Sequence, residues 1–146
     1  MNNGIEVSIP GKIVISGEYA VLDGAPAIVS TVKQKVKISI QKSVNNHNIY
    51  STSALDGVFP FRTDDDSNVL WLDADPGIFG SLLKYAFRIL KPKLKEKLCI
   101  DIESSEFFQT TKDGTVHKLG IGSSAAVSVG ITQALSEYQA ILSSPE

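Results

Sequence analysis

The sequence predicts an α+β fold, in which two main helices pack on a mostly antiparallel sheet of about five or six strands. Two observations lead to this class. Several segments alternate apolar and polar side chains, which is the period of a half-buried strand. Two longer segments carry apolar residues three and four positions apart, as one face of an amphipathic helix does. The chain has 146 residues, enough for one domain with its own hydrophobic core.

The N-terminal third contains the clearest strand signals. Residues 5–9 alternate, Pro10-Gly11 interrupts them, and residues 12–16 continue as an apolar run. Because a continuous apolar run suits a strand covered on both sides, we expect residues 12–16 to be buried on both faces. An apolar run at 27–32 and a clean alternation at 35–41 extend the β-structure.

Two further strand regions are predicted in the middle of the chain. Residues 49–62 suit a short hairpin broken at Asp56-Gly57, a turn signal. Residues 98–103 alternate again and predict a single strand. Cys99 lies in this strand, and because no partner pattern accompanies it, we interpret it as a buried strand residue rather than a nucleophile.

Two polar segments connect these elements. The acidic run at 64–66 invites a metal hypothesis, but metal-binding loops usually space their ligands so that several reach one ion. We therefore interpret the run as a solvated loop. Residues 104–118 form a polar connection with a turn at Asp113-Gly114.

Two helices are predicted. Asp75-Pro76 opens the first, since Asp can cap free N–H groups and Pro tolerates the first helical position, and Pro92 ends it. Four lysines between residues 91 and 97 flank its end, where they complement the helix dipole and face solvent. The second helix runs from about Ser124 to Leu142. The buried stripes are expected to be Phe79, Leu82, Leu83, Ala86, Phe87 and Leu90 in the first, and Val127, Ile131, Leu135, Tyr138 and Leu142 in the second.

Composition argues against several function classes. The net charge of −2 gives no bulk electrostatic reason to bind nucleic acid or an anionic membrane. One cysteine cannot form an internal disulfide, which favours a reducing compartment. The N-terminal residues show no charged leader followed by an apolar segment, and no apolar run approaches the length of a membrane span. We therefore expect a cytoplasmic location.

The strongest functional signal is the segment from Lys118 to Ala126, which reads Lys-Leu-Gly-Ile-Gly-Ser-Ser-Ala-Ala. Its glycines let the backbone turn sharply and approach a ligand, and the first N–H groups of the following helix have no intrahelical acceptor. Together these features suit a phosphate group. The residues equally suit a plain helix start capped by Ser123 or Ser124. The spacing fits neither a Walker loop nor a dinucleotide-binding fingerprint.

A second signal lies between residues 10 and 28, where Lys12 and Glu18 bracket an apolar strand. A lysine beside a phosphate loop would neutralise charge on a transferred phosphoryl group. A glutamate close to that lysine would orient the lysine or the substrate. The alternative is a surface lysine and a turn glutamate, which contribute little.

Taken together, the two segments resemble the first and second signature motifs of the GHMP kinases, a family that includes galactokinase and mevalonate kinase. The first has the form Pro-Gly-Lys…Gly-Glu-Tyr-Ala-Val…Ala-Pro-Ala-Ile, and the second Gly-Ile-Gly-Ser-Ser-Ala-Ala. The resemblance spans the chain but is specific only over residues 10–28 and 118–130. It implies ATP and Mg²⁺ as cofactors, and an N-terminal domain resembling domain 2 of ribosomal protein S5.

By position, the resemblance implies these roles. Lys12 contacts the transferring phosphate or the substrate and is the catalytic candidate. Ser124 is the candidate ligand of Mg²⁺. Glu18, Tyr19 and His117 lie on the acceptor side, although a solvated loop position is the simpler interpretation of His117. The nucleotide-binding set is Lys118, Gly120, Ile121, Gly122, Ser123, Ser124 and Ala125.

Two details favour the phosphomevalonate kinases within this family. Tyr19 stands where mevalonate kinases usually carry histidine, and Lys118-Leu119 precedes the loop as in the Lys-x-Gly-x-Gly-Ser-Ser pattern. The implied reaction transfers the γ-phosphoryl group of ATP to 5-phosphomevalonate in isoprenoid synthesis. Mevalonate kinase is the nearest alternative, and a non-catalytic module that binds nucleotide or protein is an alternative of another class.

The resemblance covers only the N-terminal domain of the family, which we assign to residues 1–146. The C-terminal domain and the aspartate that activates the acceptor have no counterpart in this sequence. We therefore expect little kinase activity from this polypeptide alone, since phosphoryl transfer depends on positioning and charge neutralisation. A homodimer, or pairing with a separate C-terminal half, is the protein partnership to test.

Overall fold

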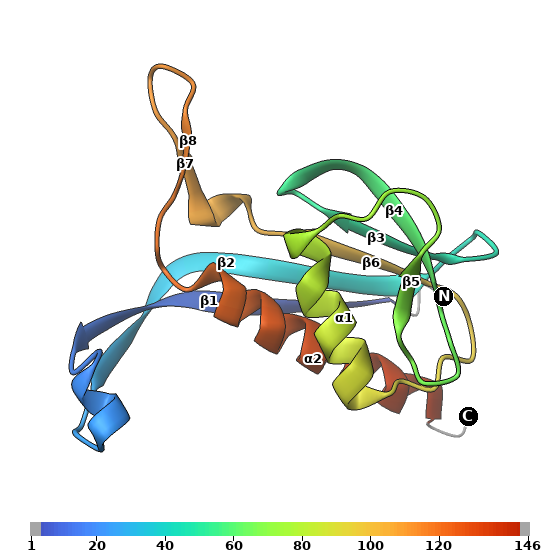
Figure 1. Ribbon diagram of the computed structural model, residues 1–146, viewed down its shortest axis with the longest axis horizontal. Coiled ribbons are helices and arrows are strands. Elements are labelled where there is room, and N and C mark those ends of the chain that lie inside the picture. The colour runs from blue at the N-terminus through green and yellow to red at the C-terminus, as the bar shows by residue number, and fades with distance from the viewer. Residues whose placement is uncertain (1–3, 144–146) are drawn as a thin grey trace.

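The computed structural model describes residues 4–143, which form a six-stranded sheet with two helices on one face (Figure 1). The strand order is β1-β2-β6-β3-β4-β5, and every neighbouring pair is antiparallel except β3 and β6. The predicted α+β class is therefore confirmed. The elements are β1 (Ile5–Ser16), β2 (Ile28–Lys42), β3 (Asn48–Thr52), β4 (Leu55–Thr63), β5 (Val69–Trp71), β6 (Leu98–Glu103), α1 (Ile78–Leu90) and α2 (Ser123–Ser143).

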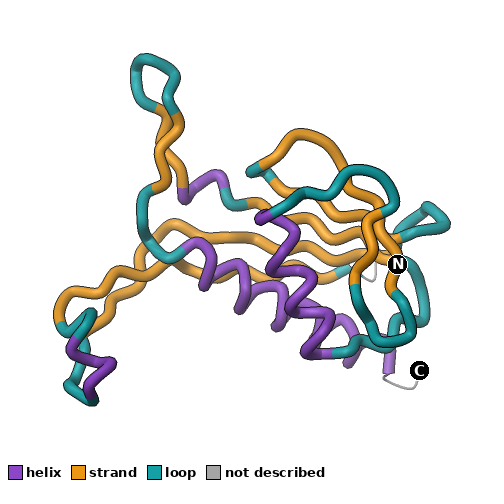
Figure 2. The backbone as a smooth tube through the Cα atoms, in the orientation of Figure 1, coloured by secondary structure: helices purple, strands orange, loops and turns teal. Residues whose placement is uncertain are grey.

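Smaller elements complete the chain (Figure 2). A 3₁₀ turn, η1 (Ala20–Asp23), lies between β1 and β2. Another, η2 (Ser105–Phe107), follows β6 and leads into a two-stranded ribbon of β7 (Phe108–Thr110) and β8 (Val116–Lys118). This ribbon projects from the body of the domain and is not hydrogen-bonded to the large sheet (Figure 1).

The core lies between the sheet and the helices. Strand alternation places one row of side chains from β2 and β6 against α2, and the pairs Ile38–Ile102 and Ile40–Ile100 lie opposite each other in the ladder. Burying these aliphatic side chains is the main stabilising contribution, at roughly 1.5–3 kcal/mol for each. The fully or almost fully buried members are Val36, Ile38, Ile40, Leu98, Ile100, Ile102, Ile131, Ala134, Leu135 and Tyr138.

An aromatic cluster fixes α1 against the other half of the sheet. The Phe61 ring lies 5.6 Å from Phe87 of α1 and 5.5 Å from Trp71, both edge to face, and Trp71 lies 5.7 Å from Tyr50. The Tyr50 hydroxyl donates a 2.6 Å hydrogen bond to the Phe79 carbonyl. Burial raises the pKa of Tyr50 to about 12, so this donor keeps its proton at neutral pH. The first turn of α1 is thereby held beside β3.

Several boundaries differ from the sequence prediction. Pro10-Gly11 does not end β1 but produces a register shift within it, and residues 28–42 form a single strand. The hairpin turns at residues 53–54, so Asp56-Gly57 lies inside β4. The short β5 and the ribbon β7–β8 were not predicted, because each strand spans only three residues and offers no periodicity to detect.

The prediction that residues 12–16 are covered on both faces is wrong. Beyond the helices, β1 and β2 continue as a two-stranded arm that ends in η1 (Figure 1). Ile15 is 63% exposed there. A local apolar run records hydrophobicity but not whether another layer lies over it. The exposed large apolar side chains of the arm are Ile13, Ile15, Tyr19, Val21, Leu22, Ile28 and Val29.

Other local predictions are confirmed only in part. Asp64 accepts hydrogen bonds from Asp66 and Asn68, which closes an exposed turn like the solvated loop that the sequence predicts. Cys99 lies in β6 but is only half-buried, and desolvation raises its pKa. The helix α1 begins at Ile78, preceded by Gly77, so Asp75 does not cap it and Pro76 is not its first residue as predicted; Asp75 instead accepts a 2.7 Å hydrogen bond from the Gly77 N–H. None of the helices in the described part of the chain is long and apolar enough to cross a membrane.

Leu83 tests the packing of α1. Leu83→Ala removes a side chain with no exposed surface, so the free energy of unfolding should fall by about 2–5 kcal/mol. Ile89→Ala on the same helix, where the side chain is 76% exposed, is the matched control and should change it by less than about 0.5 kcal/mol. Urea titration followed by circular dichroism measures both, and equal losses would contradict the assigned helix face.

Glu96 gives a pH-dependent prediction. It accepts a 2.7 Å hydrogen bond from the Tyr138 hydroxyl, which lowers its pKa, and it pairs with Lys42 at 3.2 Å. A folded-state pKa below the unfolded value stabilises the fold above the ordinary glutamate range, and this contribution disappears as the pH falls through the lowered pKa. In Glu96→Gln, the free energy of unfolding, measured by urea titration, should therefore depend less steeply on pH in the acid range. If this pH dependence were the same in the variant and the unmodified chain, the stabilising role of Glu96 would be contradicted.

Candidate active site

The structure brings the two sequence motifs into direct contact. The backbone N–H of Lys12 in β1 donates a 2.9 Å hydrogen bond to the carbonyl of Ile121 in the glycine loop. A Cβ atom on Gly122 would lie 3.1 Å from Cγ of Lys12, so the stem of the lysine side chain passes beside the loop backbone. The catalytic candidate and the phosphate-loop candidate therefore form one site, although more than a hundred residues separate them.

Gly11 permits this contact. A Cβ atom there would lie 2.8 Å from the Ile121 carbonyl oxygen, 2.9 Å from Cε1 of Phe107 and 3.0 Å from Cγ2 of Val32. A methyl group has no room among these three atoms, one of which is a backbone oxygen. The Pro10-Gly11 interruption seen in the sequence is thus a close-approach position between β1 and the loop.

The glycine loop has the geometry of an anion-binding helix start. Gly120 and Gly122 have φ values of 71° and 79°, in the left-handed region that favours glycine. Because α2 begins at Ser123, Gly122 takes the position before the helix, and both serines lie in its first turn. Neither serine is therefore the helix cap that the sequence left open. Free N–H groups and the positive end of the helix dipole converge here, which favours a phosphate.

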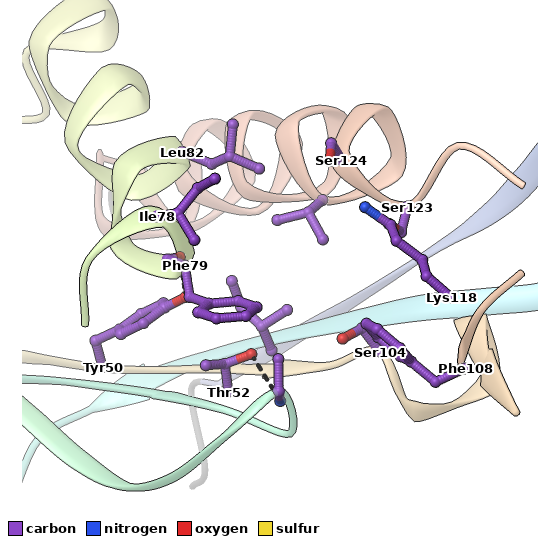
Figure 3. A pocket seen from close by; sticks show the side chains of 13 residues that line it. Tyr50, Thr52, Ile78, Phe79, Leu82, Ser104, Phe108, Lys118, Ser123 and Ser124 are labelled. Atoms are coloured by element: carbon purple, nitrogen blue, oxygen red, sulfur yellow. Dashed lines mark hydrogen bonds between the residues drawn. The ribbon is translucent and has the colours of Figure 1, made fainter. Parts of the chain in front are cut away.

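A cavity of about 280 Å³ adjoins this helix start (Figure 3). Its walls are mainly apolar, and hydroxyl groups and one lysine stand at its edges. In Figure 3, Lys118 extends toward Ser123, Phe108 lies beside Ser104, and Phe79 faces the cavity from α1. The lining residues are Tyr50, Thr52, Ala54, Ile78, Phe79, Leu82, Ile102, Ser104, Phe108, Lys118, Ser123, Ser124 and Val127.

Much of this cavity was not predicted from the sequence. Phe79 and Leu82 were assigned to the buried stripe of α1, but Phe79 is 41% exposed and both line the cavity. Phe108 lies opposite Lys118 in the ribbon, so one short pair of strands delivers an aromatic ring and a cation to the same opening. Three-residue strands and a helix stripe carry no sequence signal that separates a cavity wall from a core.

The remaining predicted residues are distributed around the site. Ser123 is buried, whereas Ser124 and Ala125 are exposed at the start of α2. His117 is exposed on β8 and does not line the cavity. Glu18 and Tyr19 lie at the end of the arm, and Tyr19 is 79% exposed. Within residues 4–143, no ion pair joins Glu18 to Lys12.

Mg²⁺ fits this site only in part. The ion usually keeps several waters and is bound by one or two carboxylates together with substrate phosphates. Here the exposed Ser124 hydroxyl provides one oxygen ligand at the helix start, and no carboxylate lines the adjoining cavity. Protein ligation of the ion by the described residues would therefore rest on one hydroxyl, with phosphate oxygens supplying the charge.

Comparisons with known proteins find similarity to small-molecule kinases. No protein-family model matches the chain. A mevalonate kinase of Saccharolobus solfataricus is 28% identical over 138 residues, covering 94% of this chain and 39% of that protein. The crystal structure of the Lin0012 protein from Listeria innocua has a TM-score of 0.71 at 26% identity, covering 92% of this chain and 36% of that one.

Two further solved structures share the fold. A mevalonate kinase of Methanococcus jannaschii has a TM-score of 0.67 at 23% identity, covering 92% of this chain and 40% of that one. A Streptococcus pneumoniae phosphomevalonate kinase in complex with phosphomevalonate and AMPPNP has a TM-score of 0.61 at 20% identity, covering 97% of this chain and 38% of that one. This chain thus spans about two fifths of the length of these relatives.

The proteins named in these comparisons include small-molecule kinases, and the chain is similar to them in fold and, for one of them, in sequence. The similarity to mevalonate and phosphomevalonate kinases agrees with the resemblance of the two sequence motifs to those of the GHMP kinases. Mevalonate and phosphomevalonate kinases both occur among its relatives, so the comparisons do not separate the two.

Gly11→Ala tests the contact between the motifs. The added methyl group collides with the Ile121 carbonyl, so the hydrogen bond from the Lys12 N–H should break and the free energy of unfolding should fall by about 1–3 kcal/mol. Amide hydrogen exchange of Lys12, followed by NMR, should accelerate. Ser8→Ala, at an exposed position of the same strand, is the control and should leave the exchange unchanged. Unaltered protection of Lys12 in Gly11→Ala would contradict the assignment.

Proposed function

We propose that this chain forms the ATP-binding part of a kinase that transfers the γ-phosphoryl group of ATP to 5-phosphomevalonate. The observation that carries the proposal is the contact between Lys12 and the glycine loop, beside an apolar cavity. A nucleoside triphosphate can bind where a cation and converging N–H donors meet its phosphates and an apolar surface contacts its base. This site offers all three.

The geometry suggests how the nucleotide binds. The base enters the apolar cavity between Phe79 and Phe108, and the phosphates extend to the N-terminus of α2. Lys118 lines the cavity at that end and extends toward Ser123, so both side chains face the position of a phosphate. Lys12, on the other side of the loop, neutralises charge on the phosphoryl group that is transferred. Bound Mg²⁺ would supply further charge neutralisation, with Ser124 as its protein ligand.

Acceptor identity rests on two residues of the sequence. Tyr19 and Lys118 support 5-phosphomevalonate, as in the phosphomevalonate kinases, and the Streptococcus pneumoniae structure holds that compound. Mevalonate is the second candidate, favoured by the sequence similarity to a mevalonate kinase. Calorimetric titration of each compound into the chain saturated with AMPPNP distinguishes them. Tighter binding of mevalonate would reverse the assignment.

Turnover is a separate question from binding. The chain covers 39% of its mevalonate kinase relative, and the described residues place no carboxylate in the cavity to activate an acceptor. We therefore propose that the isolated chain binds nucleotide but does not turn it over efficiently. Rapid ADP release that depends on an acceptor would contradict this. A binding module without catalysis remains the alternative of another class, and a stable complex with a second protein in the absence of ATP binding would favour it.

Ser124→Ala tests the phosphate site. Loss of a hydroxyl that contacts a charged ligand costs about 1.5–3 kcal/mol, so the Kd for Mg-ATP should rise about tenfold or more. Calorimetry on the chain measures the change. Ser136→Ala, at an exposed position roughly three turns further along the same helix, is the matched control and should bind as the unmodified chain does. Equal affinities of the two variants would place the phosphates elsewhere.

A further inference from the structure

The 3₁₀ turn η2 lies where the sheet, the glycine loop and the arm meet (Figure 1). Its last residue, Phe107, has no exposed surface, in contrast to Phe108, whose ring lines the cavity. The Phe107 N–H donates a 3.0 Å hydrogen bond to the Ser104 carbonyl, which closes the turn. The backbone on both sides of Phe107 is therefore fixed at the end of β6.

Phe107 contacts both halves of the candidate site. Its ring lies under β1, where a Cβ atom on Gly11 would be 2.9 Å from Cε1. Its carbonyl accepts a 2.9 Å hydrogen bond from the Leu119 N–H, at the entrance to the glycine loop. One residue thus supports the backbone beneath Lys12 and also holds the loop that Lys12 contacts.

The neighbouring Glu106 closes an irregularity in the sheet. Between β1 and β2 the register shifts from Pro10–Lys35 to Lys12–Thr31, so the ladder is interrupted beside Gly11. The Lys35 N–H, at the edge of this interruption, donates a 3.0 Å hydrogen bond to Oε2 of Glu106. The turn η2 is thereby anchored to β2 as well as to β1 and the loop.

We propose that Phe107 is a positioning residue of the nucleotide site, which sets the separation between Lys12 and the glycine loop. The inference rests on the proposed function for its effect on ATP, but the contact geometry that it explains does not depend on a ligand. A smaller side chain at position 107 leaves space beneath Gly11, so β1 can settle away from Ile121 and the Lys12 N–H loses its acceptor. Such a shift moves Lys12 away from the phosphate. Binding is then weakened, because a displaced cation neutralises the phosphate charge less well.

The test compares Phe107→Leu with Phe87→Leu. Both phenylalanines have no exposed surface, but the Phe87 ring packs against Phe61 rather than against the loop. Urea unfolding should show a similar loss of stability in the two variants. Calorimetry with Mg-ATP, at a temperature where both are folded, should show at least about tenfold weaker binding for Phe107→Leu only. Amide exchange of Lys12 and Leu119 should accelerate in that variant only.

The two measurements separate the two proposals. Equal exchange rates and equal Mg-ATP affinities in the Leu variants would overturn the role of Phe107, while binding by both would leave the proposed function standing. Absence of Mg-ATP binding by the unmodified chain and by Phe87→Leu would overturn the proposed ATP site, and the exchange rates of Lys12 and Leu119 would then decide the role of Phe107. If Phe107→Leu does not fold, Phe107→Met with the control Phe87→Met gives the same comparison.

Discussion

The close approach of β1 to the glycine loop is the constraint on which the site depends. The Lys12 N–H reaches the Ile121 carbonyl only because Gly11 has no side chain, and the stem of Lys12 then runs past Gly122. Gly11 and Gly122, which are far apart in the sequence, thus allow the backbones of β1 and the glycine loop to lie close together. This arrangement fixes a flexible lysine at its root, so that only the outer part of its side chain must be ordered by a ligand.

A second set of contacts gives the cavity its shape. The aromatic cluster holds α1 on the sheet, and the Tyr50 hydroxyl bonded to the Phe79 carbonyl positions the first turn of that helix. The ribbon brings Phe108 and Lys118 to the opposite side. An apolar cavity beside the positive end of α2 can take a ligand with one aromatic part and one anionic part, because each part meets the surface that suits it.

The arm has a different character from the rest of the domain. Its large apolar side chains are exposed, and the turn η1 at its end contains no buried residue. Glu18 and Tyr19, which belong to the first motif, lie there and not beside the cavity. The first motif is therefore divided in space: Gly11 and Lys12 lie against the glycine loop, and the second half of the motif faces solvent.

Sequence alone determined the elements and the local chemistry of this protein. Alternation and apolar runs predicted every strand of the main sheet except the short β5, and apolar stripes predicted both helices. The glycine loop and Lys12 were singled out as candidates from their residue types. Tertiary structure decided which of these segments meet. Local periodicity records which side of an element is apolar but not what lies against it, so Phe79 and Leu82 resembled core residues and Ile13–Ile15 resembled a covered strand. The roles of Gly11 and Phe107 arise from distances to atoms far away in the chain, which no local pattern contains.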